Sequence, residues 1–300
     1  MEQSDNKQSH DKISPTAKLA AYFRSLSDIP FSKEIAEAIQ AEQAARRMLG
    51  DKITIMAKFQ APLIEARYKT INAGLKKIDP EVVIEFACGL LPRGLEIAQS
   101  NIDYIGTDLP DLLSESSSIL SGIAFRLGIA TEKLRFQSCN VLNKDEVNKS
   151  ASIFKGQKIG VCNEGLLMYL NMKEKAVMAE NVREILLPSN GAWITTDIVS
   201  RDSRRDLFSS LKPNQNDFIK SVFGDISSQV GRDVTENDFA NEDEAVNFYK
   251  NLGFEIEKYA FRDVNCKLST FLHISSDEKE WIDILEIILS KFEAWILTPN

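Results

Sequence analysis

The segment Val82–Gly94 (VVIEFACGLLPRG) has the residue types of a ligand-binding turn between a strand and a helix. Its first three residues are β-branched and apolar, as expected for a strand buried on both faces. Gly89 and Gly94 bracket the turn, and an apolar helix start follows. Such a turn presents backbone N–H groups at the carboxyl end of a sheet, where doubly wound α/β proteins bind ligands. The segment therefore predicts a small-molecule site.

The glycine spacing distinguishes this turn from two common nucleotide-binding loops. The dinucleotide fingerprint G-x-G-x-x-G requires a glycine two residues after Gly89, where the chain has Leu91. A P-loop requires Lys followed by Ser or Thr after its second glycine, whereas Leu-Glu follows Gly94. Both loops therefore lack groups that bind phosphate here, and the negative charge of Glu85 at the strand end would repel a phosphate. We therefore place Glu85 in a site for a nucleoside without phosphates, such as S-adenosylmethionine.

Asp108 follows the second predicted strand, Asp103–Thr107 (DYIGT). It lies roughly 20 residues after the glycine turn, where a carboxylate can accept hydrogen bonds from both ribose hydroxyls. The alternative is that Asp108 caps the next helix, although Asp111 or Ser114 could supply that cap. We expect the ribose role.

Asn140 follows the third predicted strand, Leu134–Ser138 (LRFQS). A polar side chain at this strand end could hold the amino group of adenine, while Val141 or Leu142 packs on the face of the base. The alternative is an ordinary turn residue, because Asn is common in turns.

Glu164 and Arg67 are charged residues in apolar surroundings. Glu164 lies between a buried strand and the apolar sequence GLLMYL, where an acid is costly without a partner. It could hold the methionyl ammonium, or it could be a helix-capping acid favoured by the dipole. Arg67 lies on an apolar helical face and could bind a carboxylate with two hydrogen bonds. Alternatively, Arg67 forms a surface ion pair with Glu65 or another neighbouring acid.

Tyr169 follows the fourth predicted strand and Asp197 is the last residue of the fifth, and on the basis of these strand-end positions alone we expect them to orient the methyl acceptor. Neither of the two histidines is an obvious general base, because His10 lies in a polar tail and His273 alternates with apolar residues. An enzyme without a clear base suits a substrate that is already a nucleophile, such as a carboxylate.

Composition limits the partners of the chain. With 36 basic and 44 acidic residues, the net charge is −8, which argues against a nucleic acid or an anionic membrane surface. No run of about 18 apolar residues occurs, so no membrane span is expected. The four cysteines show no C-x-x-C spacing, which favours buried free thiols, no metal and a cytoplasmic protein.

Hydrophobic periodicity predicts a doubly wound α/β fold with an N-terminal helical cap. Amphipathic segments separate five predicted strands, and this alternation specifies a parallel sheet with helices on both faces. The strands are Val82–Phe86, Asp103–Thr107, Leu134–Ser138, Ile159–Asn163 and Ala192–Asp197.

The end of the chain predicts a change to antiparallel pairing. Phe254–Phe261 and Lys267–Ser275 are β-rich and too close together for a crossover helix, so we expect a hairpin. A last amphipathic helix, Trp281–Ile296, is expected to pack on the sheet or on a partner chain. We expect a disordered tail (1–15) without a secretory signal and a single domain (16–300), divided into a helical cap (16–78), a cofactor-binding core (79–199), a lid insertion (200–242) and a terminal hairpin and helix (243–300).

Three strings resemble the leucine carboxyl methyltransferase family: IEFACGLLPRG at Ile84–Gly94, TDLP at Thr107–Pro110 and EGLLMYL at Glu164–Leu170. The resemblance runs from about Pro15 to His273 and is nearest to the bacterial branch that includes tetracenomycin-type polyketide O-methyltransferases. It implies a class I methyltransferase fold with S-adenosylmethionine as methyl donor.

By this resemblance, each end of the donor has its own residues. Arg67, with assistance from Lys18, would bind the carboxylate, Gly89 would line the methionyl arm, and Glu164 would bind the amino end. Asp108 would bind the ribose, and Asn140 and Val141 the adenine. Asn140 departs from the aspartate often found in the family at its position.

The sequence thus predicts an S-adenosylmethionine-dependent O-methyltransferase acting on a carboxylate or hydroxyl of a small molecule, such as a polyketide-like metabolite. Two alternatives remain open. One is a protein C-terminal carboxyl methyltransferase, which would need a narrow channel for a peptide end. The other is a catalytically silent nucleoside-binding protein.

Overall fold

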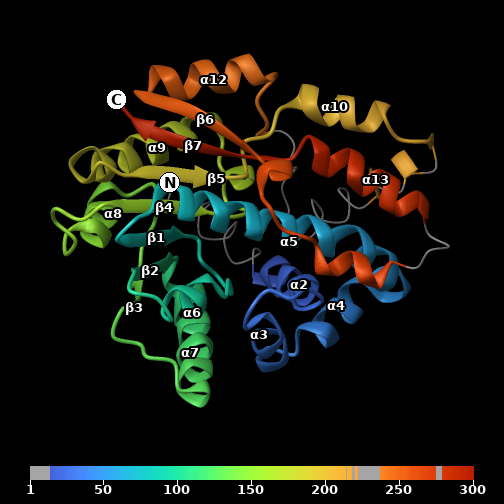
Figure 1. The fold of residues 1–300 in the computed structure, drawn as a ribbon, viewed down its shortest axis with the longest axis horizontal. Helices are drawn as coiled ribbons and strands as arrows, with labels where there is room; N and C mark the ends of the chain where they lie inside the picture. The colour runs from blue at the N-terminus through green and yellow to red at the C-terminus, as the bar shows by residue number, and fades with distance from the viewer. Residues whose placement is uncertain (1–13, 214, 218–219, 222–236, 275–278) are drawn as a thin grey trace, which may run out of the picture.

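The β-branched runs of the sequence pair in one seven-stranded sheet with the strand order β3-β2-β1-β4-β5-β7-β6. The computed structural model describes residues 14–300 except 214, 218–219, 222–236 and 275–278 (Figure 1). Strands β1 to β5 are mutually parallel, and β7 is antiparallel to both of its neighbours. The strands are β1 (Val82–Phe86), β2 (Asp103–Asp108), β3 (Leu134–Ser138), β4 (Ile159–Asn163), β5 (Ala192–Thr195), β6 (Phe254–Ala260) and β7 (Glu293–Pro299).

Helices cover both faces of this sheet, as the alternating pattern predicts. The α-helices are α2 (Ser14–Ser25), α3 (Ser32–Ala38), α4 (Ala41–Leu49), α5 (Ile53–Ile78), α6 (Arg93–Ile97), α7 (Pro110–Leu127), α8 (Lys144–Ala151), α9 (Met172–Leu186), α10 (Arg201–Ser209), α12 (Glu242–Asn251) and α13 (Lys279–Ser290). Short 3₁₀ helices are η1 (Gly50–Lys52), η2 (Leu167–Tyr169), η3 (Leu187–Ser189), η4 (Phe261–Asp263) and η5 (Ser269–His273). One core cluster joins the sheet to α8, α9 and α12, and another joins it to α5, α6 and α7.

The N-terminal helices form an additional layer. Helices α2, α3 and α4 pack on one another, α2 and α4 also pack on α5, and α3 packs on α7. Figure 1 shows the three helices gathered on one side of α5, near α7. Apolar residues of α2 and α4 make a separate core cluster with the first half of α5. The expected fold class is confirmed: this is a doubly wound, Rossmann-like sheet, mostly parallel with antiparallel strands at its end, and it carries an N-terminal helical cap.

The prediction of a second hairpin strand at Lys267–Ser275 is wrong, whereas the prediction that the sheet ends in antiparallel strands is confirmed. The predicted strand Lys267–Ser275 instead contains η5, and Ser275 lies outside the described residues. The carboxylate of Glu65 accepts hydrogen bonds from the backbone N–H and the hydroxyl of both Ser269 and Thr270. This segment is therefore held against α5 and does not pair with β6.

The predicted helix Trp281–Ile296 is also corrected. Helix α13 ends at Ser290, and Glu293–Pro299 forms β7, which pairs with β5 and β6. The run Ala294–Leu297 is fully buried between two strands. A short, continuous apolar run suits either a buried strand or a buried helix, so periodicity alone does not separate them.

Several predictions concern residues that are only partly described. Residues 1–13 of the predicted tail lie outside the described residues, whereas Ser14 and Pro15 belong to α2. The predicted lid, 200–242, contains α10, but positions 214, 218–219 and 222–236 are outside the description. Among the helices that are described, none has the length and apolarity needed to cross a membrane.

Gly94 supplies the close packing of α6 on the sheet. A Cβ at this position would lie 2.6 Å from a ring carbon of Tyr104 and 3.0 Å from a methyl carbon of Leu134. We predict that Gly94→Ala lowers the free energy of unfolding by about 1–3 kcal/mol, because the strand side chains must move. Gly122→Ala is the control, since no atom lies within 4 Å of its added Cβ in α7. It should raise stability by up to about 1 kcal/mol, and equal effects of both changes in urea unfolding would contradict the packing role.

Candidate functional site

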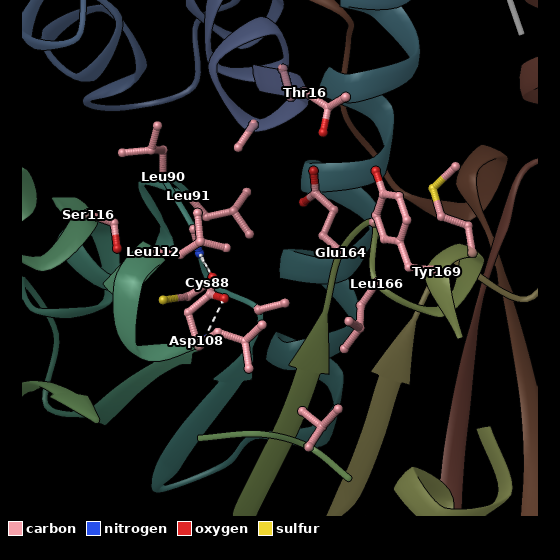
Figure 2. A pocket seen from close by; sticks show the side chains of 18 of the residues that line it. Thr16, Cys88, Leu90, Leu91, Asp108, Leu112, Ser116, Glu164, Leu166 and Tyr169 are labelled. Atoms are coloured by element: carbon pink, nitrogen blue, oxygen red, sulfur yellow. Dashed lines mark hydrogen bonds between the residues drawn. The ribbon is translucent and has the colours of Figure 1, made fainter. Parts of the chain in front are cut away.

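A cavity lies at the carboxyl ends of β1 to β4, between the sheet and the N-terminal helices. Its walls come from the glycine turn after β1, the ends of β2, β3 and β4, and helices α2, α5 and α7. Figure 2 shows Asp108 on one side and Glu164 and Tyr169 on the other. Eight of the predicted site residues line this cavity: Lys18, Arg67, Gly89, Asp108, Asn140, Val141, Glu164 and Tyr169.

The glycine turn and Asp108 hold each other in place. Gly89 has a φ of +45°, a left-handed conformation that suits glycine, and its N–H donates to Oδ2 of Asp108 at 2.9 Å. The N–H of Leu109 donates to Oδ1 at 2.8 Å. Burial raises the pKa of Asp108, while these two backbone hydrogen bonds act in the opposite direction. Helix α7 has no side-chain N-cap, so the alternative capping role does not apply.

Glu164 lies between two buried arginines. Its Oε1 is 3.2 Å from Nη2 of Arg24, and its Oε2 is 3.2 Å from Nη2 of Arg93. Burial alone would raise the pKa of Glu164, but the charges of Arg24, Arg93 and Arg67 hold it below its usual value. The carboxylate is therefore ionised and partly engaged before any ligand binds.

Glu85 departs from its predicted place in the cofactor site. It is fully buried below the cavity and is not among the residues that line it. Its carboxylate pairs with Nη1 of Arg93 and accepts a hydrogen bond from the Tyr104 hydroxyl at 2.5 Å. An acid at the end of a buried strand needs such partners, and here they come from within the protein rather than from a ligand.

Arg93 joins the two glutamates. It is fully buried, and its Nε donates to Oδ1 of Asn72 at 2.7 Å. Its guanidinium carbon also lies 4.5 Å from the centre of the Tyr68 ring. Sequence reasoning missed both Arg93 and Arg24. The available signal was the same for each: an arginine in an apolar stretch, PRGLEI for Arg93 and AAYFRSL for Arg24.

Arg67 and Arg24 carry unused hydrogen-bond donors at the cavity. In the described part of the chain, the Nε atoms of both side chains are buried and have no hydrogen-bond partner. Glu65 is not the ion-pair partner of Arg67, because its oxygens accept from Lys69 and from the η5 segment. Nζ of Lys18 lies 3.3 Å from Oε1 of Glu115 at the edge of the cavity. The arginine donors are suitably placed for an anionic group of a ligand.

The Asn140 side chain already makes a turn. Its Oδ1 accepts from the backbone N–H of Leu142 at 3.0 Å, and the backbone N–H of Asn140 donates to Oε2 of Glu146 at 2.7 Å. This is the turn role that the sequence left as an alternative. Asn140 still lines the cavity together with Val141 and Leu142, which supply apolar surface at this end.

Tyr169 lines the cavity, but Asp197 does not. Burial raises the pKa of the Tyr169 hydroxyl, which shares a hydrogen bond with Thr16, so Tyr169 is a neutral hydrogen-bonding group. The Asp197 carboxylate points to the backbone N–H groups of Gly165, Leu166 and Leu167. Its predicted contact with an acceptor is therefore corrected to a contact with the turn after β4.

The cavity contains no activated thiol among its described residues. Cys88 and Cys139 line it as free cysteines. Burial raises the pKa of Cys88 well above its usual value and that of Cys139 to about 12. Since a thiolate is the reactive form, neither side chain is suited to nucleophilic catalysis at neutral pH. Elsewhere in the described chain, no group of three His, Cys, Asp or Glu side chains could hold a metal ion.

Neither a scan against protein-family models nor a search of curated proteins gives a match. Solved structures give distant likenesses. A SAM-dependent methyltransferase from Anabaena variabilis ATCC 29413 is 13% identical, with 78% of this chain and 85% of that chain covered and a TM-score of 0.47. The plantazolicin methyltransferase BamL is 12% identical over 96% and 98% of the two chains, with a TM-score of 0.45.

A magnesium protoporphyrin IX methyltransferase from Synechocystis PCC 6803 is 9% identical over 85% and 89% of the two chains, with a TM-score of 0.44. Because the identities are this low and the TM-scores lie below 0.5, these likenesses say nothing about the chemistry of this chain. The chemistry depends on the cavity itself.

The charge on Glu164 predicts a pH-dependent contribution to stability. We expect Glu164→Gln to lower the free energy of unfolding by about 3–5 kcal/mol at pH 7, because buried Arg24 loses its ion-pair partner and buried Arg93 keeps only Glu85. The folded-state pKa lies below the usual value of 4.5. The contribution is therefore complete well above pH 4.5 and is lost as the pH falls through the lower, folded-state pKa.

Urea unfolding of both proteins between pH 7 and pH 4 measures this difference. Glu115→Gln is the control, because its ion pair with Lys18 is exposed and worth at most about 1 kcal/mol. A difference for Glu164→Gln that stays constant down to pH 4, or that is no larger than that of the control, would rule out the buried ion pairs as its cause.

Proposed function

We propose that the protein is an S-adenosylmethionine-dependent O-methyltransferase for a small molecule. The observation that carries the proposal is the Asp108 carboxylate, which the glycine turn holds inside the cavity at the end of β2. In doubly wound folds, an acid at this strand end accepts hydrogen bonds from ribose hydroxyls. The turn lacks the glycine and lysine patterns that bind phosphates, so a nucleoside without phosphates fits better.

The residues of the cavity fit such a donor at each of its ends. Asp108 would bind the ribose, and the apolar side chains of Val141 and Leu142 would pack on the adenine. At the other end, the unpaired Nε of Arg67 matches a carboxylate, because guanidinium groups bind carboxylates with charge-assisted hydrogen bonds. Glu164 would accept a hydrogen bond from the amino group.

S-adenosylmethionine, when bound, supplies a methyl group on a positively charged sulfur. The chain's own residues then have to align an acceptor and exclude water. The cavity is suited to this, because helices α2 and α5 cover it and leucines form much of its wall. Tyr169, fixed by its hydrogen bond to Thr16, would orient the acceptor.

The acceptor atom in this proposal is a carboxylate or hydroxyl oxygen. The motif resemblance to the leucine carboxyl methyltransferase family, especially its polyketide branch, supports an oxygen acceptor of the polyketide type. None of the described residues that line the cavity is a histidine. A carboxylate acceptor fits this lining best, because it is deprotonated at neutral pH and needs no general base.

Calorimetric titration tests the donor site directly. We expect the wild-type protein to bind S-adenosylhomocysteine and Asp108→Asn to bind it about 10- to 100-fold more weakly, because hydrogen bonds to a charged acceptor are lost. The control is Asp111→Asn, an exposed acid three residues away that does not line the cavity, and its affinity should match that of the wild type. A folded wild-type protein that binds neither S-adenosylmethionine nor S-adenosylhomocysteine would refute the proposal.

A further inference from the structure

The turn after β4 presents several side chains to the cavity from a short stretch of backbone. Glu164, Leu166, Met168 and Tyr169 all line the cavity. The same turn passes close to another wall, because Nη1 of Arg67 lies 3.6 Å from the place that a Cβ on Gly165 would occupy. A small shift of this turn would therefore change two sides of the cavity at once.

The Asp197 carboxylate accepts hydrogen bonds from three consecutive backbone N–H groups of this turn. Oδ1 of Asp197 accepts from Gly165 at 2.9 Å, and Oδ2 accepts from Leu166 at 2.7 Å and from Leu167 at 3.2 Å. Oδ2 also accepts from the side-chain amide of Asn163 at 2.7 Å. Only a carboxylate can accept on both oxygens here, because an amide would direct N–H groups at donors.

Asp197 is in turn held by a buried hydrogen-bond network that begins in the aromatic core. The indole N–H of Trp193 donates to Oδ1 of Asn163 at 2.7 Å, and Nδ2 of Asn163 donates to the Thr195 hydroxyl at 3.0 Å. The Thr195 hydroxyl also accepts from the N–H of Asp197 at 3.1 Å. Trp193 is fully buried and packs edge-on against Tyr249, with ring centres 5.7 Å apart.

We propose that Asp197 is a positioning residue. Its carboxylate fixes the position of the Glu164–Tyr169 turn in the cavity without touching a ligand. This inference rests on the proposed function for the roles of Glu164 and Tyr169. Glu164 at the donor and Tyr169 at the acceptor share one anchor, so loss of that anchor changes donor affinity and acceptor alignment together. Asp108, at the far side of the cavity, affects the donor alone.

Hydrogen exchange of the ligand-free protein tests the anchor independently of any activity. In Asp197→Asn, the amide protons of Gly165, Leu166 and Leu167 should exchange about 10-fold faster or more, because charge-assisted acceptors are lost. Thr195→Val is the milder second variant. It keeps the Asp197 carboxylate but removes the hydroxyl that accepts from the Asp197 backbone N–H, so exchange at the same three amides should become faster to a smaller degree. Unchanged exchange at these amides in both variants would overturn the inference.

Glu65→Gln is a matched control from the same chain. Glu65 is a fully buried carboxylate that accepts backbone N–H groups of Ser269 and Thr270, as Asp197 does for its own turn. None of these three residues lines the cavity. The control should lower the melting temperature while leaving exchange at residues 165–167 unchanged.

Calorimetry with S-adenosylhomocysteine then separates positioning from general destabilisation. Asp197→Asn should bind the ligand about 10-fold more weakly, since small misplacements of binding groups are costly, whereas Glu65→Gln should stay within 2-fold of the wild type. Faster exchange with unchanged affinity in Asp197→Asn would overturn the positioning role. Absence of binding by the wild type would instead overturn the proposed function, and the exchange result alone would then decide whether Asp197 anchors the turn.

Discussion

The cavity depends on a buried chain of alternating charges, Glu85–Arg93–Glu164–Arg24. Each of these groups would be costly to bury alone, so each requires its neighbour. Glu85 belongs to the central strand β1 and Arg24 to helix α2. These ion pairs therefore connect the N-terminal helical layer to the carboxyl edge of the sheet. The enclosed space above the strand ends follows from this connection.

The same charges divide the cavity into two chemically different ends. Asp108 stands at one end beside apolar side chains, whereas the Glu164 end combines one carboxylate with three arginine side chains. A ligand with an uncharged nucleoside part and an amino acid part would match both ends. This division is the physical basis of the proposed donor site, and it is independent of which acceptor is methylated.

The sequence predicted those features that local chemistry determines. The glycine turn, Asp108 at a strand end and the alternation of strands and helices all depend on short-range patterns, and the fold class was confirmed. Strand β7 and the η5 segment were mispredicted, because an apolar run fits helix or strand and because Glu65 holds η5 from 204 residues away. Glu85 and Asp197 were assigned to ligands because the sequence does not show which buried protein groups are their partners.

A crystal structure of the protein with S-adenosylhomocysteine would test the donor site most directly. We predict that the ribose hydroxyls contact the Asp108 carboxylate, that the ligand carboxylate contacts Arg67, and that Glu164 contacts the amino group while keeping its arginine partners. Density for the ligand outside this cavity, or within it in the reverse orientation with the adenine at Glu164, would contradict the assignment of the two ends.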